Sequence, residues 1–215
     1  HPARAVSSVK ESGADLLVVM NASPFHSGKD LIRRKVVQTQ ARLHTLPIVF
    51  CNLIGGQDEL VFDGGSFSCD RNGEILAQAV FFNESLMTIT LDQEQISSEF
   101  KERLLDSERA TYEALVLGVR DYVEKNSFPG VLIGLSGGID SALTLAVAVD
   151  ALGAKRVKAV MMPSQFTASM SREDASAMAS GLGVDYSEIE IKPMFDSFMK
   201  GLSGEFLGKA FDTTE

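Results

Sequence analysis

Cysteine, histidine and long apolar runs are all scarce in this chain of 215 residues. The two cysteines, Cys51 and Cys69, form no C-x-x-C pair, which favours a reducing, cytoplasmic setting over a disulfide framework. The three histidines are scattered, so they predict no metal centre of their own. No apolar run approaches the roughly 18 residues of a membrane-spanning helix, and no secretory or transit pattern opens the sequence. We therefore expect a cytoplasmic protein without a membrane span.

Basic residues are also outnumbered by acidic ones. Lysine and arginine number 20 against 29 aspartates and glutamates, which gives a formal net charge of −9 at pH 7. This balance argues against nucleic acid and against an acidic membrane surface as partners. The apolar fraction of 45% is ample for buried cores, and the length allows one or two domains. We therefore expect neither nucleic acid nor a membrane surface as a partner.

One stretch, VLIGLSGGIDS at residues 131–141, indicates a phosphate-binding turn. Its first five residues are apolar and uncharged, as expected for a buried parallel strand, and the helical run after the turn stops at Gly153. Glycines in the turn let the backbone approach an anion closely. The free N–H groups and positive dipole end of the helix would face that anion, and Ser136 and Ser141 would add hydroxyl donors.

Asp140 in this turn predicts a bound cation. A carboxylate beside a phosphate is unfavourable unless a cation lies between them, so we interpret Asp140 as a Mg²⁺ ligand. The Walker A pattern is excluded because residues 134–141 lack its lysine, and the dinucleotide fingerprint G-x-G-x-x-G is absent as well. The alternative interpretation is a tight turn between strand and helix that binds no ligand.

SGGIDS after an apolar strand resembles the pyrophosphate loop of the ATP pyrophosphatases. These enzymes cleave ATP to AMP and pyrophosphate while they adenylate an acid or amide. In that family the loop after the next strand, here MPSQFTASM, embraces the adenosine. Met162 and Ser164 are therefore candidate adenine and ribose contacts, although a core or loop role for each stays open. The resemblance implies an ATP site formed by Gly134, Leu135, Ser136, Gly137, Gly138, Ile139, Asp140, Ser141, Met162 and Ser164.

Residues 1–92 carry another α/β pattern, in which buried strands flank a helix and a hairpin follows around an Asp-Arg-Asn-Gly turn. The predicted elements are helices at 2–12 and 30–45 and strands at 15–20, 47–54, 67–69, 74–80 and 86–91. NASPF and GGQDELVFDGGS in this part match closely the nitrilase-fold glutaminase domain of glutamine-dependent NAD synthetases, in its C-terminal half. The resemblance implies that Ser23 and Lys29 hold the glutamine substrate. An ordinary turn role for Ser23 and a solvated charge for Lys29 stay open.

The nitrilase family uses a Glu-Lys-Cys triad, to which residues 1–92 contain no match. In the family, the cysteine lies shortly before the segment that begins here at His1. Cys51 lies inside an apolar strand and Cys69 in the hairpin, so both are predicted to be structural thiols. We therefore expect no catalytic residue of glutamine hydrolysis in this chain. We expect it to be part of a longer one, with the deamido-NAD site and another metal carboxylate beyond residue 215.

The rest of the chain is predicted to hold a helical linker at 93–106 and a second domain at 107–215. The amphipathic helix that opens this domain is expected to pack on its sheet. Strands at 157–162 and 184–191 alternate with helices, and residues 171–174 have the S-x-x-D form of a capping box that opens one of these helices. The alternation predicts a doubly wound parallel sheet that binds ligands at the C-terminal ends of its strands, near a switch in strand order.

The predicted fold is therefore α/β. It comprises the C-terminal part of a nitrilase-like α-β-β-α sandwich, followed by the N-terminal part of a Rossmann-like parallel-sheet ATP-pyrophosphatase domain. The order of NASPF, GGQDELVFDGGS, the helical linker, FPGV and GLSGGIDSALT resembles that of bacterial-type glutamine-dependent NAD synthetases.

This resemblance implies ATP-dependent amidation of deamido-NAD through an adenylated intermediate, with ammonia supplied from L-glutamine. ATP and Mg²⁺ are the implied cofactors, and we expect a homo-oligomer. Two alternatives stay open. The first is another ATP-pyrophosphatase amidotransferase, such as a GMP- or asparagine-forming enzyme, although the nitrilase-like half argues against it. The second is a non-catalytic nucleotide-binding fragment.

Overall fold

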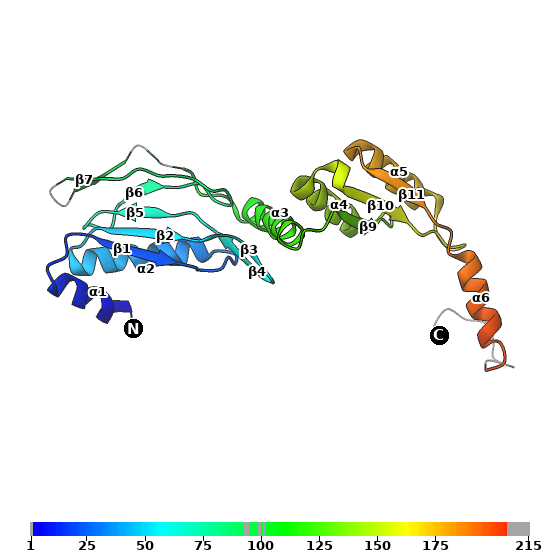
Figure 1. The fold of residues 1–215 in the computed structure, drawn as a ribbon, viewed down its shortest axis with the longest axis horizontal. Helices are drawn as coiled ribbons and strands as arrows, with labels where there is room; N and C mark the ends of the chain where they lie inside the picture. The colour runs from blue at the N-terminus through cyan, green and yellow to red at the C-terminus, as the bar shows by residue number, and fades with distance from the viewer. Residues whose placement is uncertain (1, 93–94, 99, 101, 206–215) are drawn as a thin grey trace. The chain divides into compact units, whose positions relative to one another are not determined.

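The computed structural model describes residues 2–92, 95–98, 100 and 102–205 (Figure 1). The chain divides into two compact units, His1–Ser127 and Phe128–Glu215. Among the described residues, no helix is both long enough and apolar enough to cross a membrane.

The first unit is built on a four-stranded sheet with the order β1-β2-β5-β6. Strands β1 (Leu17–Asn21) and β2 (Ile48–Asn52) are parallel, and helix α2 (Lys29–His44) connects them. Strands β5 (Phe67–Cys69) and β6 (Ile75–Gln78) form an antiparallel hairpin, which joins the sheet beside β2. The predicted succession of strand, helix, strand and hairpin is therefore confirmed.

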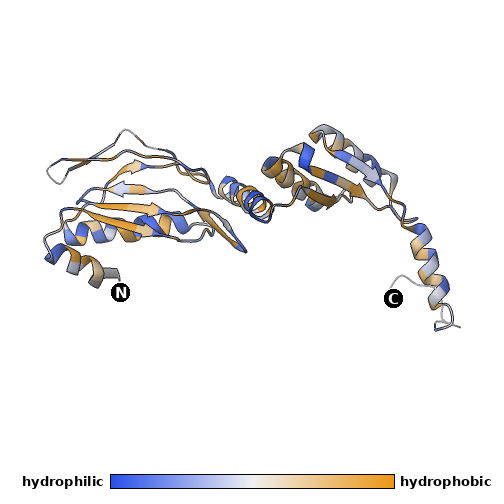
Figure 2. Cartoon of the chain, in the orientation of Figure 1, coloured by the Kyte–Doolittle hydropathy of each residue, from blue (hydrophilic) through white to orange (hydrophobic). Residues whose placement is uncertain are grey.

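Apolar side chains of α2 and the sheet form the core of the first unit. The rings of Phe50 and Phe67 stack with their centroids 5.2 Å apart, and the hydrophobic colouring of β1 and β2 in Figure 2 marks the strands that supply much of this core. Helix α1 (Pro2–Glu11) contacts α2. The buried members of the core are Val37, Ala41, Ile48, Phe50, Phe67 and Cys69.

A second hairpin, β3 (Ile54–Gln57) and β4 (Leu60–Asp63), was not predicted. Its sequence reads as a turn because it contains paired glycines, which are weak strand formers. The reason for glycine is visible in the packing: a Cβ atom at Gly56 would lie 3.0 Å from Cβ of Asp121 and 3.4 Å from Cα of Gly118. The close approach of a helix therefore explains why glycine occurs in this hairpin.

That helix is α3 (Ser107–Lys125), and the prediction that it packs on the sheet of the second domain is wrong. It packs on β3 and β4 in the first unit. Its Asp121 carboxylate accepts a hydrogen bond from the Gly56 amide at 2.6 Å, and Lys125 donates to the Gly56 carbonyl oxygen at 2.5 Å. An amphipathic pattern predicts a buried face but does not identify the surface that buries it, and here the surface is the unpredicted hairpin.

The predicted helical linker at 93–106 is not helical in its described part. Strand β7 (Thr90–Asp92) pairs with β8 (Gln95–Ser97) in an antiparallel hairpin. Backbone hydrogen bonds then join Gln78 to Phe100 and Glu102 at 2.8 and 3.0 Å. Sparse apolar residues give a helix little to bury, whereas the open edge of β6 offers the backbone ready partners. The strand predicted at 86–91 begins only at Thr90.

The second unit is built on three parallel strands in the order β11-β10-β9. They are β9 (Val131–Gly134), β10 (Val157–Met161) and β11 (Asp185–Glu188). Helices α4 (Ile139–Leu152) and α5 (Ser169–Leu182) connect them in turn. The predicted parallel α/β sheet is therefore confirmed.

Both connecting helices contact β10 and each other, so they cover the same face of the sheet. The strand order runs in one direction, so the expected switch in strand order does not occur among the described residues. Hydrophobic residues dominate β9, β10 and α4 (Figure 2), and the core between them contains Leu135, Leu145, Ala148, Val157, Ala159, Met161, Ala175 and Ala179.

Two further elements complete the described part of this unit. A 3₁₀ turn, Ala154–Arg156, precedes β10, and helix α6 (Lys192–Leu202) follows β11 with a proline in its first turn. The predicted capping box at 171–174 is wrong, because α5 begins two residues earlier, after Ala168, which makes no side-chain cap. Ser171 therefore lies inside the first turn of α5. Its carbonyl oxygen there approaches Gly137.

Candidate functional sites

The glycine-rich turn lies at the C-terminal end of β9, directly before α4. Gly137 has a φ of 82°, a left-handed value that favours glycine. A Cβ atom at this position would lie 2.2 Å from the carbonyl oxygen of Ser171 in α5. The helix therefore packs against the bare backbone of the turn, and both the conformation and the close approach require glycine here.

Two serine hydroxyls brace the turn from within. The Ser141 hydroxyl donates to the carbonyl oxygen of Gly138 at 2.9 Å and accepts from the Ser136 amide at 3.1 Å. The Ser136 hydroxyl lies 3.1 Å from that of Ser141 and accepts from the Gly138 amide at 3.3 Å. The sequence pattern predicted that these serines donate hydrogen bonds to an anion. The structure adds that their hydroxyls also shape the turn.

The start of α4 leaves backbone donors available for an anion. A backbone hydrogen bond runs from the Ala142 amide to the Gly138 carbonyl oxygen at 3.1 Å. The amides of residues 139–141 lie ahead of it in the first helical turn, where the helix offers them no acceptor. The positive end of the helix dipole points the same way. The geometry of the turn therefore suits the oxygens of a phosphate group.

Asp140 lies exposed in the first turn of α4. Among the described residues, no group of three or more histidine, cysteine, aspartate or glutamate side chains is placed to hold a metal ion. Magnesium is usually bound by one or two carboxylates together with substrate phosphates and water. A single exposed carboxylate beside a phosphate-binding turn therefore fits Mg²⁺ that arrives with a polyphosphate.

The other predicted residues of the turn contribute in different ways. Leu135 is 2% exposed and belongs to the core, while its amide donates to the carbonyl oxygen of Val160 at 2.9 Å. Ile139 is 80% exposed at the helix start. Met162 is also exposed, and its Cε lies 3.9 Å from the position that a Cβ atom would take at Gly134. The structure thus places Met162, from the next loop, beside the end of β9.

Ser164 shapes the loop after β10. Its amide donates to the Thr167 hydroxyl at 2.9 Å, and its own hydroxyl accepts from the Phe166 amide at 3.2 Å. These bonds close a tight turn in a polar loop at the strand's C-terminal end. The loop role that the sequence left open for Ser164 is therefore present, and its hydroxyl hydrogen can still point to a ligand.

An ion pair at the same edge of the sheet was missed. Arg172 donates from Nε to a carboxylate oxygen of Glu188 at 3.1 Å and pairs with the same oxygen through a second nitrogen. The Tyr186 hydroxyl donates to the other oxygen at 2.9 Å. The bond from Arg172 and then that from Tyr186 hold the pKa of the Glu188 carboxyl below its usual value. No sequence signal reveals this pair, because the partners are 16 positions apart and lie on two different elements, α5 and β11.

In the first unit, Ser23 follows β1 and is held by a buried polar network. Its amide donates to the Asn52 side-chain oxygen at 2.9 Å, and its carbonyl oxygen accepts from the Asn52 side-chain nitrogen at 3.3 Å. Its hydroxyl accepts from Nε of Arg33 at 3.1 Å. Arg33 itself forms a two-pronged ion pair with Asp63, with bonds of 2.7 and 3.0 Å. The sequence identified Ser23 but not the three residues that hold it.

Lys29 begins α2 and is not a member of this network, so the structure does not bring the two predicted glutamine residues into one hydrogen-bonded group. Its amide bonds to the His26 carbonyl oxygen at 3.0 Å. Burial raises the pKa of the Cys69 thiol to about 11, which supports a structural role for this residue because the thiol stays protonated at neutral pH.

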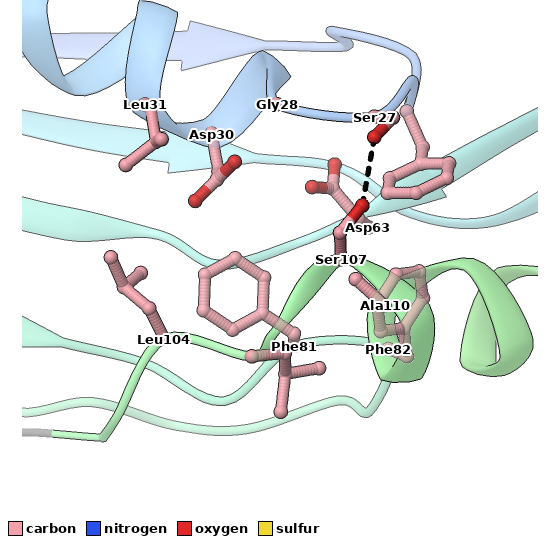
Figure 3. A pocket seen from close by; sticks show the side chains of 12 residues that line it. Ser27, Gly28, Asp30, Leu31, Asp63, Phe81, Phe82, Leu104, Ser107 and Ala110 are labelled. Carbon is pink, nitrogen blue, oxygen red and sulfur yellow. Dashed lines mark hydrogen bonds between the residues drawn. The ribbon is translucent and has the colours of Figure 1, made fainter.

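A cavity of about 190 Å³ lies beside this network in the first unit (Figure 3). Its walls include the rings of Phe25, Phe81 and Phe82 and the carboxylates of Asp30 and Asp63. Across one side, the hydroxyls of Ser27 and Ser107 lie 3.0 Å apart, as the dashed line in Figure 3 marks. The sequence did not predict this cavity, because its walls come from four separated segments. Asp63 links it to the Arg33 network.

Comparisons with known proteins show what this chain is similar to. The NAD synthase family model matches residues 111–212. A glutamine-dependent NAD(+) synthetase of Acinetobacter baylyi is 41% identical over 98% of this chain and 39% of its own length. One from Thermotoga maritima is 35% identical over 94% of this chain and 41% of its own length. The chain thus spans about two fifths of the length of the curated relatives it matches.

A solved structure agrees with these matches. Glutamine-dependent NAD+ synthetase from Acinetobacter baumannii, in complex with adenosine diphosphate, superposes with a TM-score of 0.93 at 42% identity. It covers 97% of this chain, which corresponds to 40% of that one. The resemblance predicted from the motifs is therefore confirmed: residues 111–212 match the NAD synthase family model, and the chain is similar throughout to one part of the glutamine-dependent NAD(+) synthetases.

Proposed function

We propose that this chain is part of an enzyme that amidates deamido-NAD to NAD at the expense of ATP. In this reaction ATP adenylates the nicotinate carboxylate and releases pyrophosphate, and ammonia from L-glutamine then displaces AMP. The observation that carries the proposal is the turn at residues 136–141, which opens a helix at the C-terminal edge of a parallel sheet. That turn lies inside the segment that matches the NAD synthase family, and the similar Acinetobacter baumannii enzyme was solved with adenosine diphosphate.

The turn would bind the phosphates of ATP through backbone rather than side-chain charge. Gly137 and Gly138 let the main chain approach, and the amides at the start of α4 donate to the phosphate oxygens. Ser136 and Ser141 keep the loop in shape through their mutual bonds. Asp140 would hold Mg²⁺, which neutralises phosphate charge and helps pyrophosphate to leave. Catalysis then rests on positioning and electrostatic stabilisation, with no nucleophilic side chain required.

The remaining ATP contacts follow from the placement of the two loops. Met162 would lie against the adenine, because its exposed side chain reaches the end of β9. The Ser164 hydroxyl would donate to the ribose, because one of its lone pairs already accepts from the Phe166 amide. Gly134, Leu135 and Ile139 would contribute backbone contacts around the turn.

The first unit would serve the ammonia-supplying half of the reaction. Ser23 and Lys29 would hold L-glutamine, and no catalytic residue of the hydrolysis is assigned to this chain. We propose functional domains at 1–92 and 107–215 joined by 93–106, supported by a family match that begins at residue 111, although α3 packs on the first unit. We also propose a cytoplasmic homo-oligomer that acts on small molecules and binds neither nucleic acid nor membranes.

The test is NAD formation by the protein expressed from its complete gene. Deamido-NAD, Mg²⁺ and ATP are supplied with either L-glutamine or ammonium chloride, and NAD is measured with a dehydrogenase. We expect NAD from both nitrogen sources. Failure to form NAD with either nitrogen source would refute the proposed reaction. Amidation of xanthosine monophosphate or aspartate instead would favour another amidotransferase of the same loop class.

A further inference from the structure

The network behind Ser23 carries information about what Ser23 can bind. Three polar groups of this residue are already engaged: the amide and the carbonyl oxygen by Asn52, and one lone pair of the hydroxyl by Arg33. Among the described residues, no acceptor takes the hydroxyl hydrogen. Ser23 is therefore oriented from both sides, with its O–H group as the remaining donor.

Arg33 is held too firmly to act as a mobile charge. Its side chain is 7% exposed and that of Asp63 is 3% exposed, and the two form a pair of parallel hydrogen bonds. The fixed fork geometry of a guanidinium leaves its Nε–H pointing along a defined direction once both terminal nitrogens are paired. That direction leads to the Ser23 hydroxyl oxygen, 3.1 Å away.

The Asp63 end of the pair is fixed as well. Asn52 donates to the same carboxylate at 3.3 Å, so one amide side chain touches both Asp63 and Ser23. Four residues from a loop, a helix and two strand ends thus form one connected network. A buried ion pair is costly to maintain unless its groups are well satisfied, and here the satisfied network ends at a single hydroxyl at the surface of the unit.

We infer that Arg33 is a positioning residue that fills one lone pair of the Ser23 hydroxyl and so directs its hydrogen to a hydrogen-bond acceptor on the substrate. This inference rests on the proposed binding of glutamine at Ser23. It specifies that a carboxylate or carbonyl oxygen of glutamine accepts the hydrogen bond that the Ser23 hydroxyl donates. The Arg33 side chain itself touches no substrate.

The test is a mutant cycle in the protein expressed from its complete gene. Ser23→Ala, Arg33→Lys and the double variant are compared for KM for glutamine, kcat and ammonium-driven NAD formation. Arg33→Lys keeps the positive charge that Asp63 needs but removes the Nε donor. Arg42→Lys, an exposed change on the same helix, is the matched control.

We expect Ser23→Ala to raise KM for glutamine roughly tenfold, which is the effect of one hydrogen bond lost to a charged group. Arg33→Lys should raise KM by a similar factor when Ser23 is present and should add nothing to Ser23→Ala. Ammonium-driven activity should stay unchanged in all variants. The inference would be overturned if Arg33→Lys raised KM for glutamine by the same factor with and without Ser23, because such independent effects would indicate a general structural role.

The experiment distinguishes failure of the proposed glutamine site from failure of the inference about Arg33. Wild-type protein that forms NAD from ammonium but not from glutamine would refute the glutamine site, and the inference would fall with it. A glutamine-active wild type with no coupling between the two positions would refute only the inference. If Arg33→Lys fails to fold, the Arg33→Lys, Asp63→Glu double variant restores the reach of the ion pair without the Nε donor and is expected to show the same tenfold increase in KM.

Discussion

Replacing Gly137 with alanine tests the phosphate-binding turn at its tightest point. The new Cβ would lie 2.2 Å from the carbonyl oxygen of Ser171 and 2.8 Å from its carbonyl carbon, so backbone must move on one side or the other. A left-handed φ of 82° adds its own strain, because it costs a residue other than glycine roughly 1–2 kcal/mol. Overpacking in a tight contact adds about 1–3 kcal/mol.

These terms give an expected loss of roughly 2–5 kcal/mol in the free energy of unfolding of the second unit. The matched control is Gly181→Ala in α5, where a Cβ atom would meet nothing within 4 Å. A helical glycine replaced by alanine gains about 0.5–1 kcal/mol. Urea unfolding of both variants against wild type therefore predicts shifts of opposite sign.

The same pair of variants tests ATP binding by calorimetry in the presence of Mg²⁺. A displaced turn loses hydrogen bonds from its amides to the phosphates, and each such bond contributes about 1.5–3 kcal/mol. Gly137→Ala should therefore weaken the affinity for ATP by roughly tenfold or more. Gly181→Ala should leave affinity unchanged. Wild-type affinity in a folded Gly137→Ala protein would refute the assignment of this turn to the phosphates.

Three further changes have defined outcomes. Asp140→Asn should abolish pyrophosphate release or strongly raise the Mg²⁺ concentration that it requires, without changing stability, and an unchanged Mg²⁺ titration with normal turnover would remove Asp140 from the metal site. Because the folded-state pKa of Cys69 is raised to about 11 from 9.0, its burial stabilises the fold fully below pH 9 and progressively less as pH rises toward 11. A thiol reagent at pH 8 should therefore modify Cys51 first, and equal labelling rates in folded protein would contradict this order. Asp121→Ala should lower the free energy of unfolding by about 1–3 kcal/mol, because it removes the bond to Gly56; an unchanged urea midpoint would show that α3 is held by its apolar face alone.

The phosphate-binding turn could be predicted because its parts are local. An apolar strand, two glycines and a helix start follow one another within eleven residues, and each has its own sequence signal. The same locality explains why the hairpin at residues 67–78 was anticipated from its Asp-Arg-Asn-Gly turn. In both cases the structure depends on neighbours in the sequence, so a single chain contains the required information.

The missed features depend on contacts between distant residues. Arg33 reads as one more basic residue on an amphipathic helix, and only the fold brings it to Asp63, which is 30 positions away. The β3–β4 hairpin was hidden by glycines whose purpose is the close approach of α3. The described part of 93–106 forms backbone hydrogen bonds with the edge strand β6, and no local sequence pattern predicts this pairing. Tertiary context decided each of these cases over local propensity.

The most direct test of the proposed reaction is exchange between ATP and radioactive pyrophosphate in the protein expressed from its complete gene. Adenylation of an acid is reversible, so label enters ATP only when the correct acid is present. The account predicts exchange that requires both deamido-NAD and Mg²⁺ and proceeds without glutamine or ammonium. Exchange that ignores deamido-NAD, or that requires a different acid, would contradict it.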